Sequence, residues 1–234
     1  MNEAVFFEAV RSSLFKGSMS QPQVDGLKAI LRSLDVHGVL DQEERAYVLA
    51  TAYWETSRTM SPVREAFWLS EKWRRNNLRY YPYYGRGHVQ LTWKRNYEVF
   101  SKLLDIDLVN KPDLAMDPQT SAYVLVVGMK GGLFSPAAGP LSKYLGAASN
   151  WLGARKTVNG SDRKADIAAI GKKFDAAFEL AEGPVHATEP TIDPGGPSRF
   201  PTKVTRPTPA PKVLPESSFW LALVRLVTAL WNSK

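Results

Sequence analysis

The sequence predicts a mainly α-helical domain followed by a proline-rich linker and a short apolar segment. Apolar residues recur at helical spacing in several stretches before residue 183, whereas strand-like signal is limited to short runs such as 88–92. From Pro184 to Pro215 the chain contains nine prolines and few large apolar residues. Such a composition is typical of an extended linker, because it buries too little surface to offset the entropy of ordering.

Four helices are predicted from their patterns and end signals. The first covers residues 24–34, which carry apolar side chains three and four positions apart. The second begins at Asp41, which with Glu44 has the form of a capping box, and runs to about Arg58 before Pro62 interrupts it. The third runs from Pro118 to the Gly131-Gly132 pair, and the last covers residues 162–179.

Composition excludes several kinds of chemistry. The chain of 234 residues is 44% hydrophobic and 23% charged, as is ordinary for a soluble globular protein. It contains no cysteine, so disulfides, thiolate metal sites and a cysteine nucleophile are excluded. Its three histidines, His37, His88 and His186, lack ligand spacing, and no phosphate-binding loop or serine nucleophile elbow is present. We therefore expect neither a metal nor another cofactor.

The charge favours anionic surroundings. The formal net charge is +7, which suits nucleic acid, anionic lipid or an anionic cell wall. Basic residues alternate with aromatic ones between Lys72 and Arg86, but no nucleic-acid-binding motif is present, so no nucleic-acid partner is expected.

Glu55 is the first candidate for catalysis. Val48, Thr51, Ala52 and Glu55 share one face of the second predicted helix, which places the carboxyl at the edge of an apolar stripe. Burial raises the pKa of a carboxyl, as a general acid near neutral pH requires. On spacing alone, an ion pair with Arg58 is the more common role for such a residue.

Glu65 is the second candidate. The predicted break at Pro62 allows the chain to turn back and bring Glu65 towards Glu55. Inverting glycosidases hold their two carboxyl groups about 6.5–9.5 Å apart, with a water between them. The spacing permits this geometry without requiring it, and a surface ion pair, for example with Arg64, is the alternative.

The segment YYPYYGRGHVQLTWKRNY, residues 80–97, suits a sugar. It combines five tyrosines, including Tyr84, with a tryptophan, two glycines and several amide and hydroxyl groups. Aromatic faces pack against the apolar faces of sugar rings, and glycines allow the backbone to approach a ligand closely. The alternative is a hydrophobic loop that packs on the domain.

Several segments together resemble the family 19 glycoside hydrolases, which are lysozyme-like chitinases and their phage-type relatives. The matching segments are AYVLATAYWETSRTMSPVRE (46–65), YYGRGHVQLTWKRNY (83–97), NKPDLAMDP (110–118) and VNGSD (158–162). The opening QVDGLKAIL (23–31) resembles the phage-type branch.

The resemblance implies a lysozyme-like, two-lobed helical domain with a central cleft and an inverting mechanism. Glu55 matches the general acid, Glu65 the general base, and Thr92 a residue that helps to hold the attacking water. Gln90, Asn96 and Asn159 match positions that bind the sugar and the catalytic network, and Arg86 is expected to brace the cleft. A further family arginine corresponds to Arg163 or Lys164. Trp54 departs from the family pattern, which has histidine at this position.

We interpret the protein as an endo-acting hydrolase of β-1,4 bonds in a polymer that contains N-acetylglucosamine. Peptidoglycan is the preferred substrate, as for an endolysin that acts at the bacterial cell wall, and chitin is the alternative. An inactive protein that binds the wall or a membrane is the alternative from another class, because Trp54 replaces the usual histidine.

The predicted domains are a catalytic domain at 1–182, a linker at 183–217 and an apolar segment at 218–234. Within the last, FWLALVRLVTALW would form a helix about 20 Å long, shorter than the roughly 30 Å hydrocarbon core of a bilayer. We therefore expect this helix to lie on a membrane surface, and docking on the catalytic domain is the alternative. The first ten residues lack the features of a secretory signal, so synthesis in the cytoplasm and another export route are expected.

Overall fold

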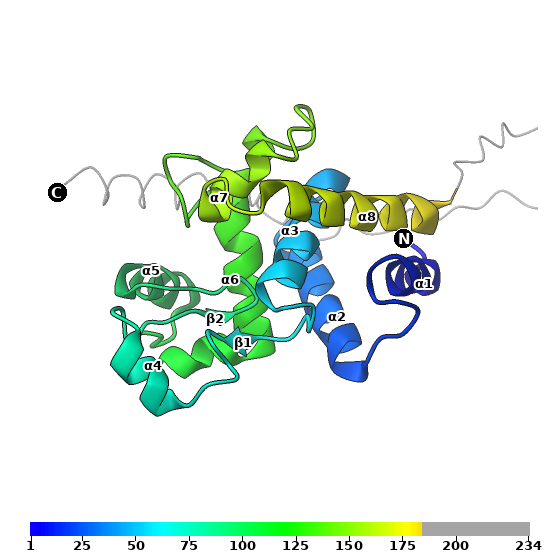
Figure 1. Ribbon diagram of the computed structural model, residues 1–234. Helices are drawn as coiled ribbons and strands as arrows, with labels where there is room; N and C mark the ends of the chain where they lie inside the picture. Colours follow the sequence, from blue (N-terminus) through cyan, green and yellow to red (C-terminus); the bar gives the residue numbers. More distant parts are fainter. Residues whose placement is uncertain (184–234) are drawn as a thin grey trace, which may run out of the picture. The chain divides into compact units, whose positions relative to one another are not determined.

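The computed structural model describes residues 1–183, and most of them are helical (Figure 1). The α-helices are α1 (Glu3–Leu14), α2 (Gln21–Val36), α3 (Gln42–Glu55), α4 (Glu71–Asn77), α5 (Lys94–Leu104), α6 (Pro118–Gly131), α7 (Lys156–Asn159) and α8 (Lys164–Glu182). Three short 3-10 helices, η1 (Pro112–Met116), η2 (Leu141–Lys143) and η3 (Gly153–Arg155), lie in the connections. The predicted mainly α fold is confirmed. The linker and apolar segment predicted from residue 184 onward lie outside the described residues.

The start of α3 follows the sequence signal, but its end does not. The Asp41 carboxylate accepts a hydrogen bond of 3.0 Å from the Glu44 amide, which caps the helix as predicted. The helix ends at Glu55 and not near Arg58. Buried Thr56 stabilises this end, because its hydroxyl donates to the Ala52 carbonyl at 2.7 Å and accepts from the Met60 amide at 3.0 Å. The chain therefore leaves the helix well before Pro62.

The other predicted helices are present with shifted bounds. Helix α6 begins at Pro118 and ends before Gly132, which adopts a left-handed φ of 65° and so forms the predicted glycine cap. Helix α2 includes the predicted stretch 24–34, and α8 begins two residues later and ends three residues later than predicted.

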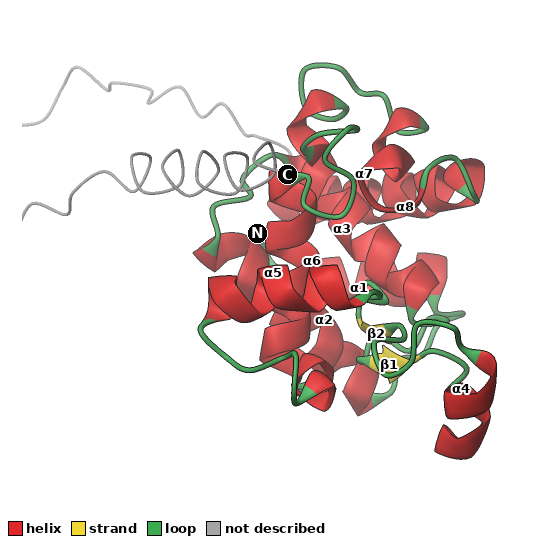
Figure 2. Cartoon of the chain, turned by 90° about the vertical axis from the view of Figure 1, so that its left-hand side faces the viewer, coloured by secondary structure: helices red, strands yellow, loops and turns green. Residues whose placement is uncertain are grey.

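Helices α3 and α8 pack along each other, α1 packs on α8, and α2 packs on α6. Figure 1 shows α8 crossing over α3, and Figure 2 shows the same helices after a quarter turn. Fully buried side chains such as Phe6, Tyr47 and Phe174 fill the space between these helices. The glycine at position 26 lets α2 approach the turn after α3, because a Cβ there would lie 1.9 Å from the Met60 carbonyl oxygen.

The only sheet within residues 1–183 has two very short antiparallel strands, β1 (Val63–Arg64) and β2 (Arg86–Gly87). The predicted strand at 88–92 is wrong, although Leu91 makes an isolated bridge to Arg86. Gln90 has a positive φ of 54°, so the chain turns back on itself and cannot continue as a strand. Within the described part of the chain, no helix combines the length and the apolar character needed to cross a bilayer.

Candidate active site

Glu55 is the last residue of α3, and its carboxylate lies against a buried arginine. Oε1 of Glu55 is 2.8 Å from Nη2 of Arg155, whose side chain is 2% exposed, whereas that of Glu55 is 17% exposed. Nε of Arg155 donates to the Asp162 carbonyl oxygen at 3.0 Å, which fixes the guanidinium group between η3 and the start of α8. The predicted ion pair with Arg58 is replaced by this long-range pair.

The environment raises the pKa of Glu55 above that of an ordinary glutamate. Burial is the largest cause, since it disfavours the charged carboxylate. The charge of Arg155 and its hydrogen bond oppose this effect, and the negative charge of Asp162 adds to it. The protonated form is therefore more populated near neutral pH than it would be in water, as expected from the apolar face of α3.

Glu65 follows β1 directly and is held from the side of β2. Its amide donates to the Gly85 carbonyl at 2.7 Å, and Oε2 accepts from the Gly85 amide at 2.9 Å. Oε1 accepts from the Tyr80 hydroxyl at 2.6 Å. Burial and this hydrogen bond raise the pKa of Tyr80 to about 12, so the hydroxyl remains a donor. Both carboxylate oxygens of Glu65 thus have fixed donors, and the sequence had not indicated either donor.

Gln90 and Thr92 lie in the turn after β2, and Asn96 lies in the first turn of α5, hydrogen-bonded to that turn. Nε2 of Gln90 donates to the carbonyl oxygens of Val63 and Gly87 at 3.0 and 3.2 Å, which ties this turn to β1. The Thr92 hydroxyl donates to the Gln90 carbonyl at 2.7 Å, and the Asn96 amide group donates to the Thr92 carbonyl at 2.8 Å. Three of the predicted site residues are therefore linked to the sheet that positions Glu65.

Two of the predicted substrate contacts have different surroundings. Tyr84 is 1% exposed, its hydroxyl donates to Glu71 at 3.0 Å, and the Arg86 guanidinium lies 3.7 Å from its ring centroid. This placement contradicts the predicted sugar contact, because the ring is covered by neighbouring side chains. Asn159 ends α7 and is exposed, as a ligand contact requires.

Arg86 is buried and makes several hydrogen bonds, and its expected role of bracing a cleft stays a prediction. It is 3% exposed, and its Nε donates to Asp113 at 2.7 Å. Its Nη1 donates to the Pro82 carbonyl at 2.8 Å and to the Tyr97 hydroxyl at 3.1 Å. The arginine thereby holds the aromatic segment 80–97 against η1.

Arg155, which the sequence analysis did not single out, pairs with Glu55, whereas the match of Arg163 or Lys164 to a family arginine stays a prediction. Arg163 is exposed, lies 3.6 Å from Asp166, and is 5.8 Å from the ring of Trp54. Trp54, which stands where the family pattern has histidine, is partly buried and packs against the core. No local signal marked Arg155, since its role depends on a contact that spans one hundred positions of sequence.

The pockets do not coincide with the predicted site residues. Within residues 1–183, no group of three or more His, Asp or Glu side chains is arranged to hold a metal ion. A pocket of about 680 Å³ lies between α2 and the start of α6, and none of the predicted site residues lines it. A smaller one, of about 240 Å³, is lined by Arg64, Phe67 and Arg74 beside β1, next to Glu65 in the sequence.

Part of the chain is similar to known proteins. The sequence profile of glycoside hydrolase family 19, chitinase class I, matches residues 46–129, which include Glu55, Glu65 and Thr92. Chitinase 11 of Oryza sativa subsp. japonica is 50% identical over 42 residues, which are 18% of this chain and 16% of the relative. The acidic endochitinase of Petunia hybrida is 46% identical over 41 residues, again 18% of this chain and 16% of the relative.

The fold similarity extends further than the sequence similarity. The crystal structure of chitinase C from Streptomyces griseus HUT6037 aligns with a TM-score of 0.53 at 18% identity, over 78% of each chain. At this identity the likeness concerns the fold alone. Residues 46–129 thus match the family 19 chitinase profile, and the described residues share a mainly helical fold with a chitinase.

Proposed function

We propose that this protein hydrolyses β-1,4 bonds between N-acetylglucosamine units by an inverting mechanism, with Glu55 as general acid. The observation that carries the proposal is the environment of Glu55 within the segment that matches the family profile. Burial raises its pKa, so the carboxyl can hold a proton near neutral pH and give it to the departing sugar oxygen. Arg155 then pairs with the carboxylate that remains.

Glu65 is the general base in this proposal. The Tyr80 hydroxyl donates to Oε1 and the Gly85 amide donates to Oε2, so the carboxylate is held in a fixed orientation from which it can accept a proton from water. Gln90 and Thr92 belong to the turn attached to the same sheet, and Asn96, in the first turn of α5, donates to the Thr92 carbonyl. In this proposal Thr92 helps to hold the attacking water. The two carboxyl groups would face each other across a cleft between two lobes, at the separation of about 6.5–9.5 Å that inversion requires.

Chitin is the first candidate substrate, because the matched relatives carry the names chitinase and endochitinase. The matched stretches span 16% of each relative's length. The activity of the whole chain is therefore proposed here and does not follow from these matches. Peptidoglycan is the second candidate and is favoured by charge. Residues 64–95, the stretch that begins next to Glu65 in the sequence, contain eight Lys or Arg against two Glu. An anionic wall polymer would be attracted there, as for a phage-type enzyme at the bacterial cell wall.

A product assay tests both candidates. Purified protein is incubated with chitin oligosaccharides and, separately, with purified peptidoglycan, and the released fragments are identified by mass spectrometry. Glu55→Gln should lower the rate by about 10²–10⁴-fold, as is typical when a general acid is removed. The matched control is Glu98→Gln, whose exposed carboxylate lies 3.7 Å from Lys94 on α5 and should be dispensable.

The outcomes are distinct. Cleavage of chitin alone supports the first candidate, and cleavage of peptidoglycan alone supports the second. If the Glu55→Gln variant cleaves the polymer at the rate of the unchanged protein, Glu55 is not the general acid. If neither polymer is cleaved although the protein sediments with one of them, the protein is a binding protein that has kept the fold.

A further inference from the structure

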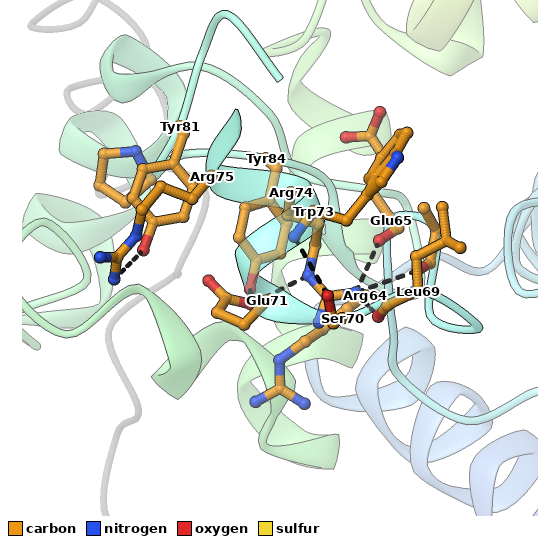
Figure 3. Close-up of polar contacts among 12 residues, drawn as sticks. Arg64, Glu65, Leu69, Ser70, Glu71, Trp73, Arg74, Arg75, Tyr81 and Tyr84 are labelled. Carbon is orange, nitrogen blue, oxygen red and sulfur yellow. Dashed lines mark hydrogen bonds and ion pairs between the residues drawn. The ribbon is translucent and has the colours of Figure 1, made fainter. Parts of the chain in front are cut away.

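Arg74 holds the backbone that carries Glu65. It lies in the short helix α4 and is 7% exposed, which is unusual for an arginine. Its Nη1 donates to the carbonyl oxygens of Leu69 at 2.9 Å and Ala66 at 3.0 Å, and a longer contact of 3.4 Å reaches the carbonyl of Glu65. Figure 3 shows the guanidinium group beneath this loop, with dashed lines to Glu65 and Leu69.

The loop 65–69 needs such support. Ala66 adopts a left-handed φ of 48°, a conformation that costs free energy for a residue with a side chain. The carbonyl oxygens of Glu65, Ala66 and Leu69 all accept from Arg74, and that of Ala66 also accepts from the Leu69 amide at 2.8 Å. Phe67 and Trp68 are 50% and 71% exposed and therefore contribute little packing to hold the loop.

Arg74 is itself fixed by two further contacts. Its Nε donates to Oε2 of Glu71 at 2.9 Å, and the same carboxylate oxygen accepts from the Tyr84 hydroxyl at 3.0 Å. The guanidinium carbon lies 5.4 Å from the centroid of the Tyr84 ring. Tyr84 directly precedes Gly85, whose amide donates to the Glu65 carboxylate. These contacts connect the backbone of Glu65, through Arg74 and Tyr84, to the Gly85 amide that donates to the Glu65 side chain.

We propose that Arg74 is a positioning residue that sets the place of the Glu65 carboxylate. The inference rests on the proposed function, in which Glu65 activates the water. Gly85 and Tyr80 fix the carboxylate from the β2 side, and Arg74 fixes its main chain from the α4 side. Without Arg74, the loop can move away from the sheet, and the carboxylate would no longer meet the water at hydrogen-bond distance.

The test compares Arg74→Met and Arg74→Lys with the unchanged protein. We expect Arg74→Met to lower kcat about 10-fold to 100-fold, the scale on which a displacement of about 1 Å acts on a catalytic group. KM should change little, because Arg74 does not contact the substrate. Arg74→Lys should recover part of kcat, since an ammonium group can reach the carbonyls but cannot also bind Glu71 in the fork geometry of a guanidinium.

Arg75 offers a matched control on the same helix. Its exposed guanidinium lies 5.4 Å from the Tyr81 ring and 3.3 Å from the Tyr81 hydroxyl, and it makes no contact with the loop 65–69. Arg75→Met removes the same charge and should leave kcat unchanged. If Arg74→Met does not fold, Arg74→Lys and Glu71→Gln provide the same comparison with a smaller perturbation.

A double-mutant cycle separates positioning from general stability. If Arg74 acts through Glu65, Arg74→Met should change the residual kcat of Glu65→Gln by less than about twofold, because coupled residues are not additive. An equal loss in both backgrounds, or a kcat unaffected by Arg74→Met, would overturn the inference. Inactivity of the unchanged protein on both polymers would refute the proposed function instead, so the two failures can be told apart.

Discussion

Buried His88 should make the domain sensitive to mild acid. Its side chain is 0% exposed, and Nε2 lies 2.9 Å from the Met60 carbonyl oxygen. A carbonyl can only accept, so Nε2 carries the proton and Nδ1 accepts from the Ser121 hydroxyl at 2.7 Å. The Ser121 oxygen also accepts from the His88 amide at 2.7 Å. Burial lowers the pKa of His88 to about 4.

The direction of the effect follows from proton linkage. The unfolded chain binds a proton at His88 near pH 6.5, whereas the folded domain does so only near pH 4. The stabilisation is therefore complete above pH 6.5 and is lost as the pH falls towards 4. At pH 4 the free energy of unfolding should be about 3 kcal/mol smaller than at pH 7 from this residue alone, at about 1.4 kcal/mol per pKa unit. For a domain of this size, that corresponds to a Tm lower by roughly 6–12 °C.

The measurement compares the pH dependence of two proteins. Unfolding is followed by circular dichroism from pH 7 to pH 4 for the unchanged chain and for His88→Gln, which cannot titrate. The variant is expected to be less stable at pH 7 but to lose about 3 kcal/mol less on acidification. Equal losses in the two proteins, or a His88 ring that titrates near pH 6.5 by NMR in the folded state, would refute the reasoning.

Three further predictions concern the site and the chain's end. Arg155→Met should raise the pKa of Glu55 further, because it removes the charge and the hydrogen bond that oppose the effect of burial. The alkaline limb of the pH profile of kcat/KM should then move to higher pH, and an unchanged limb would show that Arg155 does not influence the pKa of Glu55. Proton NMR of a fresh digest should show the α-anomer first, whereas a β-anomer would remove Glu65 as base. Truncation after Glu182 removes the apolar segment, and it should preserve hydrolysis but abolish sedimentation with anionic liposomes. Equal sedimentation of the full-length and truncated proteins would exclude membrane binding by that segment.

Local signals predicted the parts of the fold that depend on neighbouring residues. Asp41 and Glu44 marked the start of α3, and Pro118 and Gly132 marked the ends of α6, because capping involves residues only a few positions apart. The end of α3 was misplaced, since buried Thr56 closes the helix through hydrogen bonds that no proline or glycine signals. Gln90 adopts a positive φ without being glycine, so the turn that replaced the predicted strand had no local signature.

The candidate site could likewise be predicted only in part from the sequence. Glu55 and Glu65 were found from helix phase, the predicted break and the family resemblance. Their partners were not found, because Arg155 reaches Glu55 across one hundred positions and Tyr80 reaches Glu65 across fifteen. Tyr84 was misjudged for a related reason. An aromatic residue in a glycine-rich segment suits a sugar, but the same ring also packs between Arg74 and Arg86, and only the tertiary structure decides between these roles.

The partners of the two glutamates differ in a way that suits the opposite roles proposed for them. Glu55 is buried at the end of a helix, and its single cation, Arg155, does not fully offset the cost of burying its charge. Glu65 instead receives one hydrogen bond on each oxygen, from the Tyr80 hydroxyl and the Gly85 amide, and has no comparable arginine partner among the described residues in contact with its carboxylate. An acid and a base must differ in this way if both are to act at one pH. The assignment therefore depends on residues around the carboxyl groups: exchanging the donors at Glu65 or the cation at Glu55 should weaken the distinction even when both glutamates remain.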